Sequence, residues 1–169
     1  MRTGKEQKKK NWAVVLLVLY IIFLIKVIIF KYPIEHMKAI VDGWQKDVIL
    51  EGLSTANYKP FHTIRLYLKH YNTLGIIAFS NLYGNVLVFV PFGVLLPMVH
   101  KKSKNLLVLL LNTLFFVLGI EVFQLFSAFG AFDVDDILLN CLGAFLGGVL
   151  FFICEKTRPY YVKKDVKNL

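Results

Sequence analysis

The chain has 169 residues, of which 57% are hydrophobic, and its formal net charge is +9 at pH 7. A soluble domain is usually about 45–50% apolar. This composition and a mean hydropathy of +0.60 exclude an ordinary soluble protein and indicate that lipid is the surrounding solvent. The basic residues form short clusters beside apolar segments and no patch on a folded domain, so no nucleic-acid partner is predicted.

Four apolar segments are long enough to cross a membrane, since a hydrocarbon core about 30 Å thick requires about 20 residues of helix. They comprise residues 12–30, 82–99, 106–128 and 137–154. The sequence therefore predicts an all-α integral membrane protein with a bundle of about four transmembrane helices. A cleaved signal peptide would also place basic residues before an apolar run, but no small-residue cleavage site follows Phe30.

The distribution of lysine and arginine predicts the orientation of the bundle. With the amino terminus inside, thirteen of the twenty basic residues lie in the tails at 1–11 and 155–169 and in the short loop after residue 99. The loop from Ser127 to Asp136 then faces outward with three aspartates and no basic residue. We expect a multi-pass protein with both termini cytoplasmic and the long loop at 31–81 extracellular.

Two stretches of the long loop show the spacing of apolar residues that is typical of a helix. Ile34, Met37, Val41, Trp44 and Val48 make up the first, and Phe61, Ile64, Leu68 and Tyr71 the second. Two amphipathic helices are therefore predicted. They either lie flat in the headgroup region or cap the bundle.

Glu121 is the acidic residue inside the third apolar segment. An ionisable residue at the centre of a membrane helix costs about 2.5–3.5 kcal/mol on insertion scales, so it normally faces the bundle interior and serves a function. We therefore expect Glu121 to belong to a functional site. The alternative is a structural hydrogen bond to an amide such as that of Asn85.

Further polar residues are expected at the same depth, near the outer ends of the last three segments. Asp133 and Asp136 also have the spacing of a helix N-cap and the acid at N3, so capping alone would explain them. The alternative is one outward-opening polar site. Its predicted members are Asn85, Glu121, Gln124, Asp133, Asp136 and Asn140.

Gly143 and Gly147 fall on one stripe of the fourth segment together with Asp136 and Asn140. Glycines four residues apart let another helix approach closely, so this stripe predicts a packing surface that continues into the polar site. Pro91 and Pro97 are expected as kinks in the second segment, where membrane helices tolerate proline.

No pattern for a metal, a cofactor or covalent chemistry is present. His36, His62 and His70 are scattered in the long loop without an HExxH arrangement. Cys141 and Cys154 are separated by about 20 Å along one helix, which excludes a disulfide within it. No metal site and no cofactor are predicted.

Several segments together resemble the VanZ family. They are NLYGNVLVFVPFGVLLP, IEVFQ and GAFDVDDILLNCLGAFLGG, preceded by NYKPFHTI, which is similar to the family's asparagine-x-x-proline-phenylalanine motif. The matching motif residues are Asn57, Pro60, Phe61, Asn85, Pro91, Phe92, Gly93, Glu121, Gln124, Asp133, Asp136, Asn140, Gly143 and Gly147. Of these, Pro91, Gly93, Gly143 and Gly147 are expected to serve packing.

The chain departs from the family's pattern in the loop before the aspartates. Many members carry an arginine there, where this chain has Gly130 and Ala131. No role that depends on that arginine is carried over.

The resemblance implies a cell-envelope membrane protein of a Gram-positive bacterium, in a family associated with low-level teicoplanin and lipoglycopeptide resistance. The first hypothesis is a protein that binds or rearranges a lipid or lipid-linked cell-wall precursor at the outer leaflet. Lys59, His62 and Arg65 would then meet its phosphate or pyrophosphate. The second is a membrane enzyme with Glu121 or Asp136 as general acid or base. The third is a small transporter, and no oligomeric state is predicted.

Overall fold

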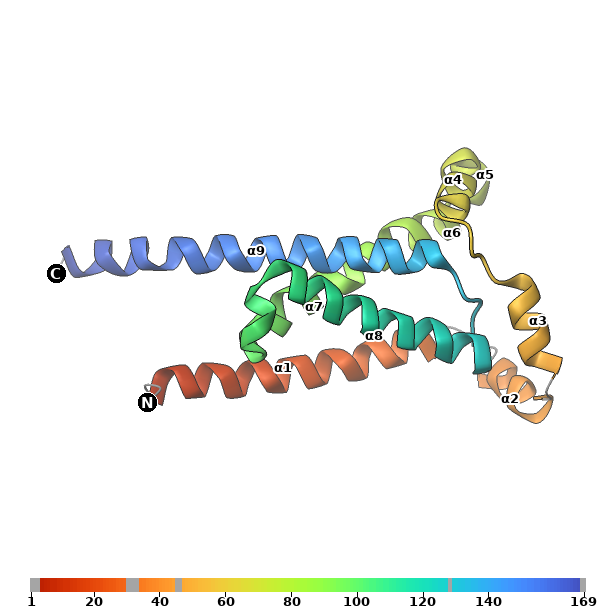
Figure 1. The fold of residues 1–169 in the computed structure, drawn as a ribbon, viewed down its shortest axis with the longest axis horizontal. Helices are drawn as coiled ribbons and strands as arrows, with labels where there is room; N and C mark the ends of the chain where they lie inside the picture. Colours follow the sequence, from red (N-terminus) through yellow and green to blue (C-terminus); the bar gives the residue numbers. More distant parts are fainter. Residues whose placement is uncertain (1–3, 30–33, 45–46, 128, 168–169) are drawn as a thin grey trace.

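The computed structural model describes residues 4–29, 34–44, 47–127 and 129–167, and these residues are almost entirely helical (Figure 1). Within these ranges the β-structure is limited to one isolated bridge between Asn57 and Asp133. The predicted all-α fold class is therefore confirmed.

Four helices are long and apolar enough to cross a membrane, as the sequence predicts. They belong to α1 (Gly4–Ile29), α7 (Asn85–Val99), α8 (Leu106–Ser127) and α9 (Val134–Lys167). The apolar parts run over Gln7–Val27, Ile76–Val99, Leu106–Ser127 and Val134–Thr157. The chain is thus a multi-pass membrane protein.

The second span begins six residues before the predicted start at residue 82, at Ile76. It starts with α6 (Ile76–Phe79), passes through a π-helical turn, η1 (Ser80–Gly84), and continues as α7. In the sequence, Ser80 and Asn81 look like a polar boundary. In the structure the Asn81 amide donates to the carbonyl of Ile77 at 2.9 Å, so its polar atoms are satisfied within the helix and the span continues through them.

At the other end of the bundle, α9 continues to Lys167, beyond the predicted boundary at 154. The short link between α7 and α8 is a 3₁₀ turn, η2 (Lys101–Lys104). There the Lys104 ammonium pairs with the carboxylate of Glu155.

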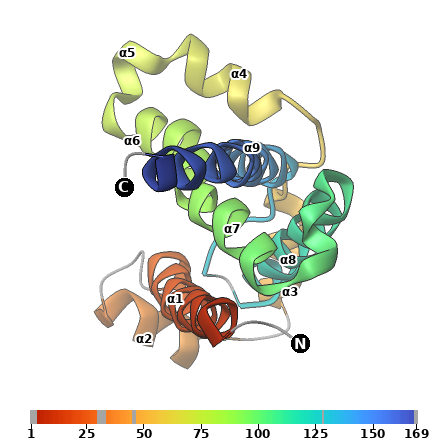
Figure 2. The ribbon, with the colours of Figure 1, turned by 90° about the vertical axis from the view of Figure 1, so that its left-hand side faces the viewer.

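Helix α7 lies in the middle of the bundle, with α1, α8 and α9 around it (Figure 2). Tyr20 and Leu24 of α1 pack into the hydrophobic core of the bundle, and the Tyr20 hydroxyl donates to the carbonyl of Val88 on α7 at 2.7 Å. The rings of Phe92 on α7 and Phe116 on α8 stack with their centroids 5.0 Å apart. Aromatic and aliphatic contacts therefore join three of the four spans.

The contact between α7 and α9 is the closest in the bundle because glycines line it. A Cβ atom on Gly143 would lie 2.0 Å from the carbonyl oxygen of Val86, and one on Gly147 would lie 2.1 Å from that of Val90. From the opposite side, a Cβ on Gly93 would lie 2.1 Å from the carbonyl oxygen of Ala144. Such distances leave no room for a side chain, so the two backbones touch.

The long loop forms α2 (Ile34–Asp42), α3 (Asp47–Thr55), α4 (His62–Lys69) and α5 (Tyr71–Leu74). All four lie at the end of the bundle where α8 connects to α9, opposite the start of α1 and the end of α9 (Figure 1). The sequence predicts one helix for each apolar pattern, whereas the structure breaks both. Gly43 and Trp44 follow α2 outside any helix, and His70 separates α4 from α5.

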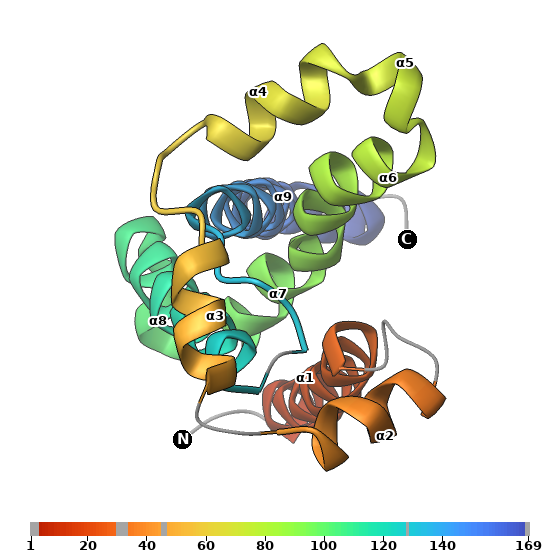
Figure 3. The ribbon, with the colours of Figure 1, turned by 90° about the vertical axis from the view of Figure 1, so that its right-hand side faces the viewer.

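Helix α3 and Trp44, which lies between α2 and α3, both contact α8, which supports the capping alternative. Gly52 of α3 lies close to the carbonyl of Leu125 on α8, and the Trp44 indole donates to the carbonyl of Phe126 at 2.9 Å. Viewed from this end, α3 covers α8, whereas α4 and α5 lie beyond α9 (Figure 3).

Candidate functional site

Polar side chains from four elements gather where α9 begins. The loop before α4 supplies Asn57, α7 supplies Asn85, and α8 supplies Glu121. The start of α9 supplies Asp133, Asp135, Asp136 and Asn140. We call these residues the polar network.

Asp133 is the N-cap of α9 and also the point at which the long loop attaches. One oxygen of its carboxylate accepts the backbone N–H of Asp135 at 2.8 Å and the Asn57 amide at 2.7 Å. Two backbone bonds join the same segments, from Asn57 N–H to Phe132 at 2.8 Å and from Val134 N–H to Asn57 at 3.0 Å. The predicted capping is thus present, and the same side chain also joins the loop to α9.

Asp135, which the sequence analysis did not assign to the site, has the most enclosed carboxylate of the network, with a relative exposure of 0%. Its two oxygens accept the backbone N–H groups of Phe61 at 2.5 Å and Ile64 at 3.1 Å. Both donors belong to the first turn of α4, which has no side-chain cap of its own because Phe61 stands at its N-cap with φ 63°. Asp135 therefore supplies the missing cap from another helix.

A signal for Asp135 does exist in the sequence. The segment KPFHTI starts a helix directly after a proline, yet no serine, threonine, aspartate or asparagine stands at the N-cap. Such a helix requires an acceptor from elsewhere in the chain. The sequence does not say which of the remaining acids supplies it.

Glu121 is buried, with a relative exposure of 2%, as expected for an acid that faces the bundle interior. Its Oε2 accepts the backbone N–H of Asp133 at 3.0 Å. The amide of Asn85, which the sequence analysis named as an alternative partner for Glu121, instead donates to Asp136 at 2.6 Å. Glu121 thus joins α8 to the start of α9, and Asp136 joins the start of α9 to α7.

Asn140 lies one turn deeper along α9 and is 6% exposed. Its carbonyl oxygen Oδ1 has no hydrogen-bonding partner within the described part of the chain. An unsatisfied buried amide oxygen costs about 1–3 kcal/mol. Among the described residues, this is the one fully buried side-chain polar atom that has no partner.

Tyr67 of α4 also belongs to this neighbourhood, although the sequence analysis did not single it out. Burial raises the pKa of its phenol above the ordinary value, and the negative charges of Asp136 and Asp133 raise it further. The hydroxyl therefore stays protonated and can donate a hydrogen bond at neutral pH.

Gln124 lies apart from the acids. It is half-buried and packs against Gly130, where a Cβ atom would approach the side-chain amide to 2.9 Å. No hydrogen bond joins Gln124 to the polar network in the described residues.

Lys59, His62 and Arg65 are exposed on and just before the first turn of α4. None of the three forms an ion pair with another described residue. The structure therefore separates the predicted binding residues into the buried and half-buried polar network and an exposed basic surface formed by these three residues, which we call the cationic surface. Asp135 connects them, because it holds the turn that carries the cations.

The chain matches the VanZ/LLP1 family over residues 17–155. It is also 32% identical over 145 residues to "Protein VanZ" of Enterococcus faecium, a match that covers 83% of this chain and 74% of that relative. No solved structure matches the chain. The matched region includes the whole polar network and the four spans, from Leu17 of the first to Glu155 of the fourth. The chain is therefore a multi-pass membrane protein of the VanZ/LLP1 family.

Proposed function

We propose that this protein binds the anionic headgroup of a lipid or lipid-linked cell-wall precursor at the outer leaflet and thereby reduces the access of glycopeptides. The observation that carries the proposal is the cationic surface of Lys59, His62 and Arg65, exposed and without an ion pair in the described residues. Cationic side chains form charge-assisted hydrogen bonds with phosphate oxygens.

The polar network supports this function by holding that turn in place. Asp135 binds two N–H groups of α4, and Asn57 joins the preceding loop to Asp133. Because Glu121 and Asp133 also accept backbone N–H groups, three of the four acids are partly neutralised by backbone dipoles. Their repulsion of an approaching phosphate is reduced accordingly.

The geometry supports binding better than catalysis. A general acid or base has to reach the reacting group, whereas Glu121 is 2% exposed and its Oε2 already accepts a hydrogen bond. Turnover of a lipid precursor by the purified protein would support the enzyme hypothesis instead, and ion or substrate flux in vesicles would support a transporter.

The test compares two pairs of exposed lysine or arginine residues at opposite ends of the bundle. The variant Lys59→Gln/Arg65→Gln should bind farnesyl pyrophosphate, a soluble prenyl pyrophosphate, more weakly than the unchanged protein by calorimetry. Lys101→Gln/Lys102→Gln removes the same number of charges from η2 and should bind normally. Equal affinity in both variants would contradict the proposed headgroup site.

The proposal also requires that α4 face outward and both termini face the cytoplasm. Cysteines introduced at Ser127 and Lys164, in a chain without Cys141 and Cys154, test this arrangement. An impermeant thiol reagent applied to intact cells should label the first and not the second. The opposite labelling pattern would show that α4 faces the cytoplasm, and it would contradict a site at the outer leaflet.

A further inference from the structure

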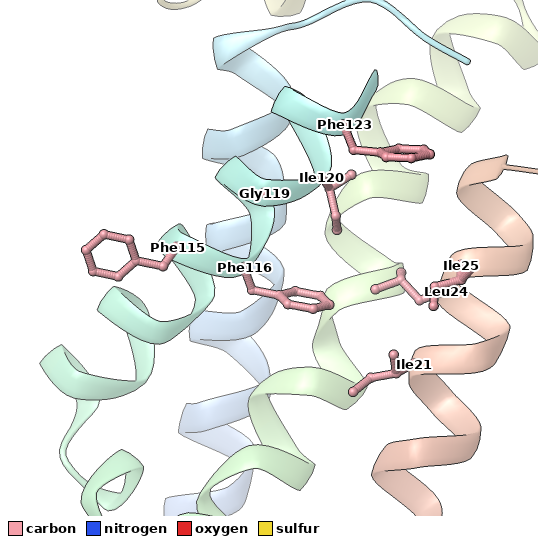
Figure 4. Close-up of a pocket in the computed structure, with 8 residues that line it drawn as sticks. All are labelled: Ile21, Leu24, Ile25, Phe115, Phe116, Gly119, Ile120 and Phe123. Carbon is pink, nitrogen blue, oxygen red and sulfur yellow. The ribbon is translucent and has the colours of Figure 1, made fainter. Parts of the chain in front are cut away.

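An apolar cleft separates α1 from α8. Ile21, Leu24 and Ile25 of α1 form one wall, and Phe116, Ile120 and Phe123 of α8 form much of the other. Figure 4 shows Phe116 and Phe123 directed towards α1, whereas Phe115 at the edge points away. We call this space the α1–α8 cleft.

We propose that the α1–α8 cleft holds one acyl chain of a membrane phospholipid, with the polar headgroup at the end of the bundle where α8 connects to α9. This site is separate from the cationic surface of α4, and the proposal stands whether or not that surface binds a headgroup.

The surroundings of the cleft require a hydrocarbon occupant. Both walls belong to membrane-spanning segments, Gln7–Val27 and Leu106–Ser127. Leu24 is almost fully buried, and Phe116 stacks on Phe92, so α7 closes the cleft from behind. A space of this size with apolar walls does not hold water, and an empty one would lose the dispersion contacts of its lining.

The dimensions favour a chain over a helix from another subunit. The cleft has a volume of about 450 Å³. Along α8 its lining runs from Phe115 to Phe123, which corresponds to about 12 Å of helix. The mean cross-section is thus about 40 Å², whereas a helix about 10 Å in diameter occupies about 80 Å². The cleft therefore fits a flexible hydrocarbon chain better than a whole partner helix.

The outer end of the cleft offers polar groups to a headgroup. The stripe of α8 that carries Phe116 and Ile120 continues at the same helical spacing to Gln124 and then Ser127. The Gln124 amide has no hydrogen-bonding partner among the described residues. A chain in the cleft would therefore place its ester and headgroup beside an available amide, as an amphiphilic lipid requires.

Crosslinking on the unchanged protein tests the proposal directly. The protein is reconstituted in vesicles that contain a phospholipid with a diazirine on one acyl chain, and the crosslinked peptides are mapped after irradiation. We expect crosslinks concentrated at residues 21–25 and 115–123. Crosslinks spread evenly over other exposed apolar positions, such as Leu107, Leu111 and Leu150, would overturn the proposal.

Two variants that fill the cleft provide the matched comparison. A Cβ atom on Gly119 or on Gly84 would meet nothing within 4 Å, but only Gly119 lines the cleft. Native mass spectrometry after detergent exchange should find a phospholipid bound to the unchanged protein and to Gly84→Phe, and lost from Gly119→Phe. Ile25→Phe, which fills the cleft from α1, should lose it as well.

Each other outcome of these experiments contradicts the proposal. Retention of the phospholipid by folded Gly119→Phe or Ile25→Phe would place the lipid elsewhere. A retained molecule with the mass of a prenyl lipid, or a second copy of the chain joined through α1 and α8, would replace the proposed occupant.

Discussion

Two pairs of apolar helices in this bundle meet in opposite ways. Between α7 and α9 the backbones touch at Gly93, Gly143 and Gly147. Between α1 and α8, large aromatic and branched side chains leave a cleft of about 450 Å³. The spans of the two pairs have similar mean hydropathy, 1.9 and 2.4 for the spans of α7 and α9 and 2.0 and 2.4 for those of α1 and α8, so mean hydropathy does not determine the packing. In a membrane there is little hydrophobic drive between helices, and the size of the side chains decides how closely they approach.

The largest expected effect on the stability of the whole bundle comes from a substitution in the close interface between α7 and α9. Gly147→Ala places a Cβ atom 2.1 Å from the carbonyl oxygen of Val90, which the backbone of α7 cannot avoid without moving. Overpacking typically costs about 1–3 kcal/mol. Gly119→Ala makes the same change in the open cleft, where helix propensity favours alanine by up to about 1 kcal/mol.

Unfolding in detergent, followed by circular dichroism, measures both variants. Gly147→Ala should lower the stability and Gly119→Ala should leave it unchanged or raise it. The same response from both glycines would mean that α7 and α9 are not in backbone contact.

The next effect concerns the polar end of the close interface. Asp135→Ala removes the acceptor of two N–H groups at the start of α4, and hydrogen bonds to charged groups contribute about 1.5–3 kcal/mol each. We expect faster hydrogen exchange in the segment from Phe61 to Ile64, while the spans stay protected. Asp42→Ala, at an exposed position in α2, should leave exchange in α4 unchanged.

A third prediction separates ionisation from structure at Glu121. Glu121→Gln keeps an oxygen that can accept the N–H of Asp133, so the protein should fold and insert, whereas Glu121→Leu leaves that donor unsatisfied. If the ionisation of Glu121 serves function, Glu121→Gln should lose the glycopeptide tolerance that overexpression confers, at unchanged stability. Full tolerance with Glu121→Gln together with poor expression of Glu121→Leu would identify Glu121 as a structural group.

The four spans could be predicted from the sequence because the thickness of the bilayer fixes the length of an apolar helix. The burial of Glu121 and the cap at Asp133 could also be predicted, since each follows from a local rule about cost or helix ends. Each of these two predictions depends on a single segment of the chain and requires no knowledge of how the helices are arranged.

The partners of these groups could not be predicted, because they depend on the rotation and register of distant helices. Asp135 binds the N–H of Phe61, 74 positions away in the chain. The sequence predicts Asn85 at the depth of the acids, but the rotation of Asn85 about α7 directs its amide to Asp136 and not to Glu121. The α1–α8 cleft could not be predicted for the same reason. No local pattern in either helix shows that the side chains of α1 and α8 leave a space between them.

The smallest expected effect is on glycopeptide resistance. It is measured in living cells with variants at the two ends of the bundle. Overexpression in a Gram-positive host should raise tolerance to teicoplanin or a lipid-tailed glycopeptide more than to vancomycin. The reason is that an action at the outer leaflet affects most strongly the drugs that anchor in the membrane. Lys59→Gln/Arg65→Gln should reduce this tolerance because it removes positive charge from the surface beside α4, while Lys101→Gln/Lys102→Gln, at the opposite end of the spans, should retain it. The measurement is the inhibitory concentration of each glycopeptide, with immunoblots of the membrane fraction to show that the protein is present. If overexpression changes none of these concentrations although the protein is in the membrane, the proposed effect on glycopeptide access is wrong.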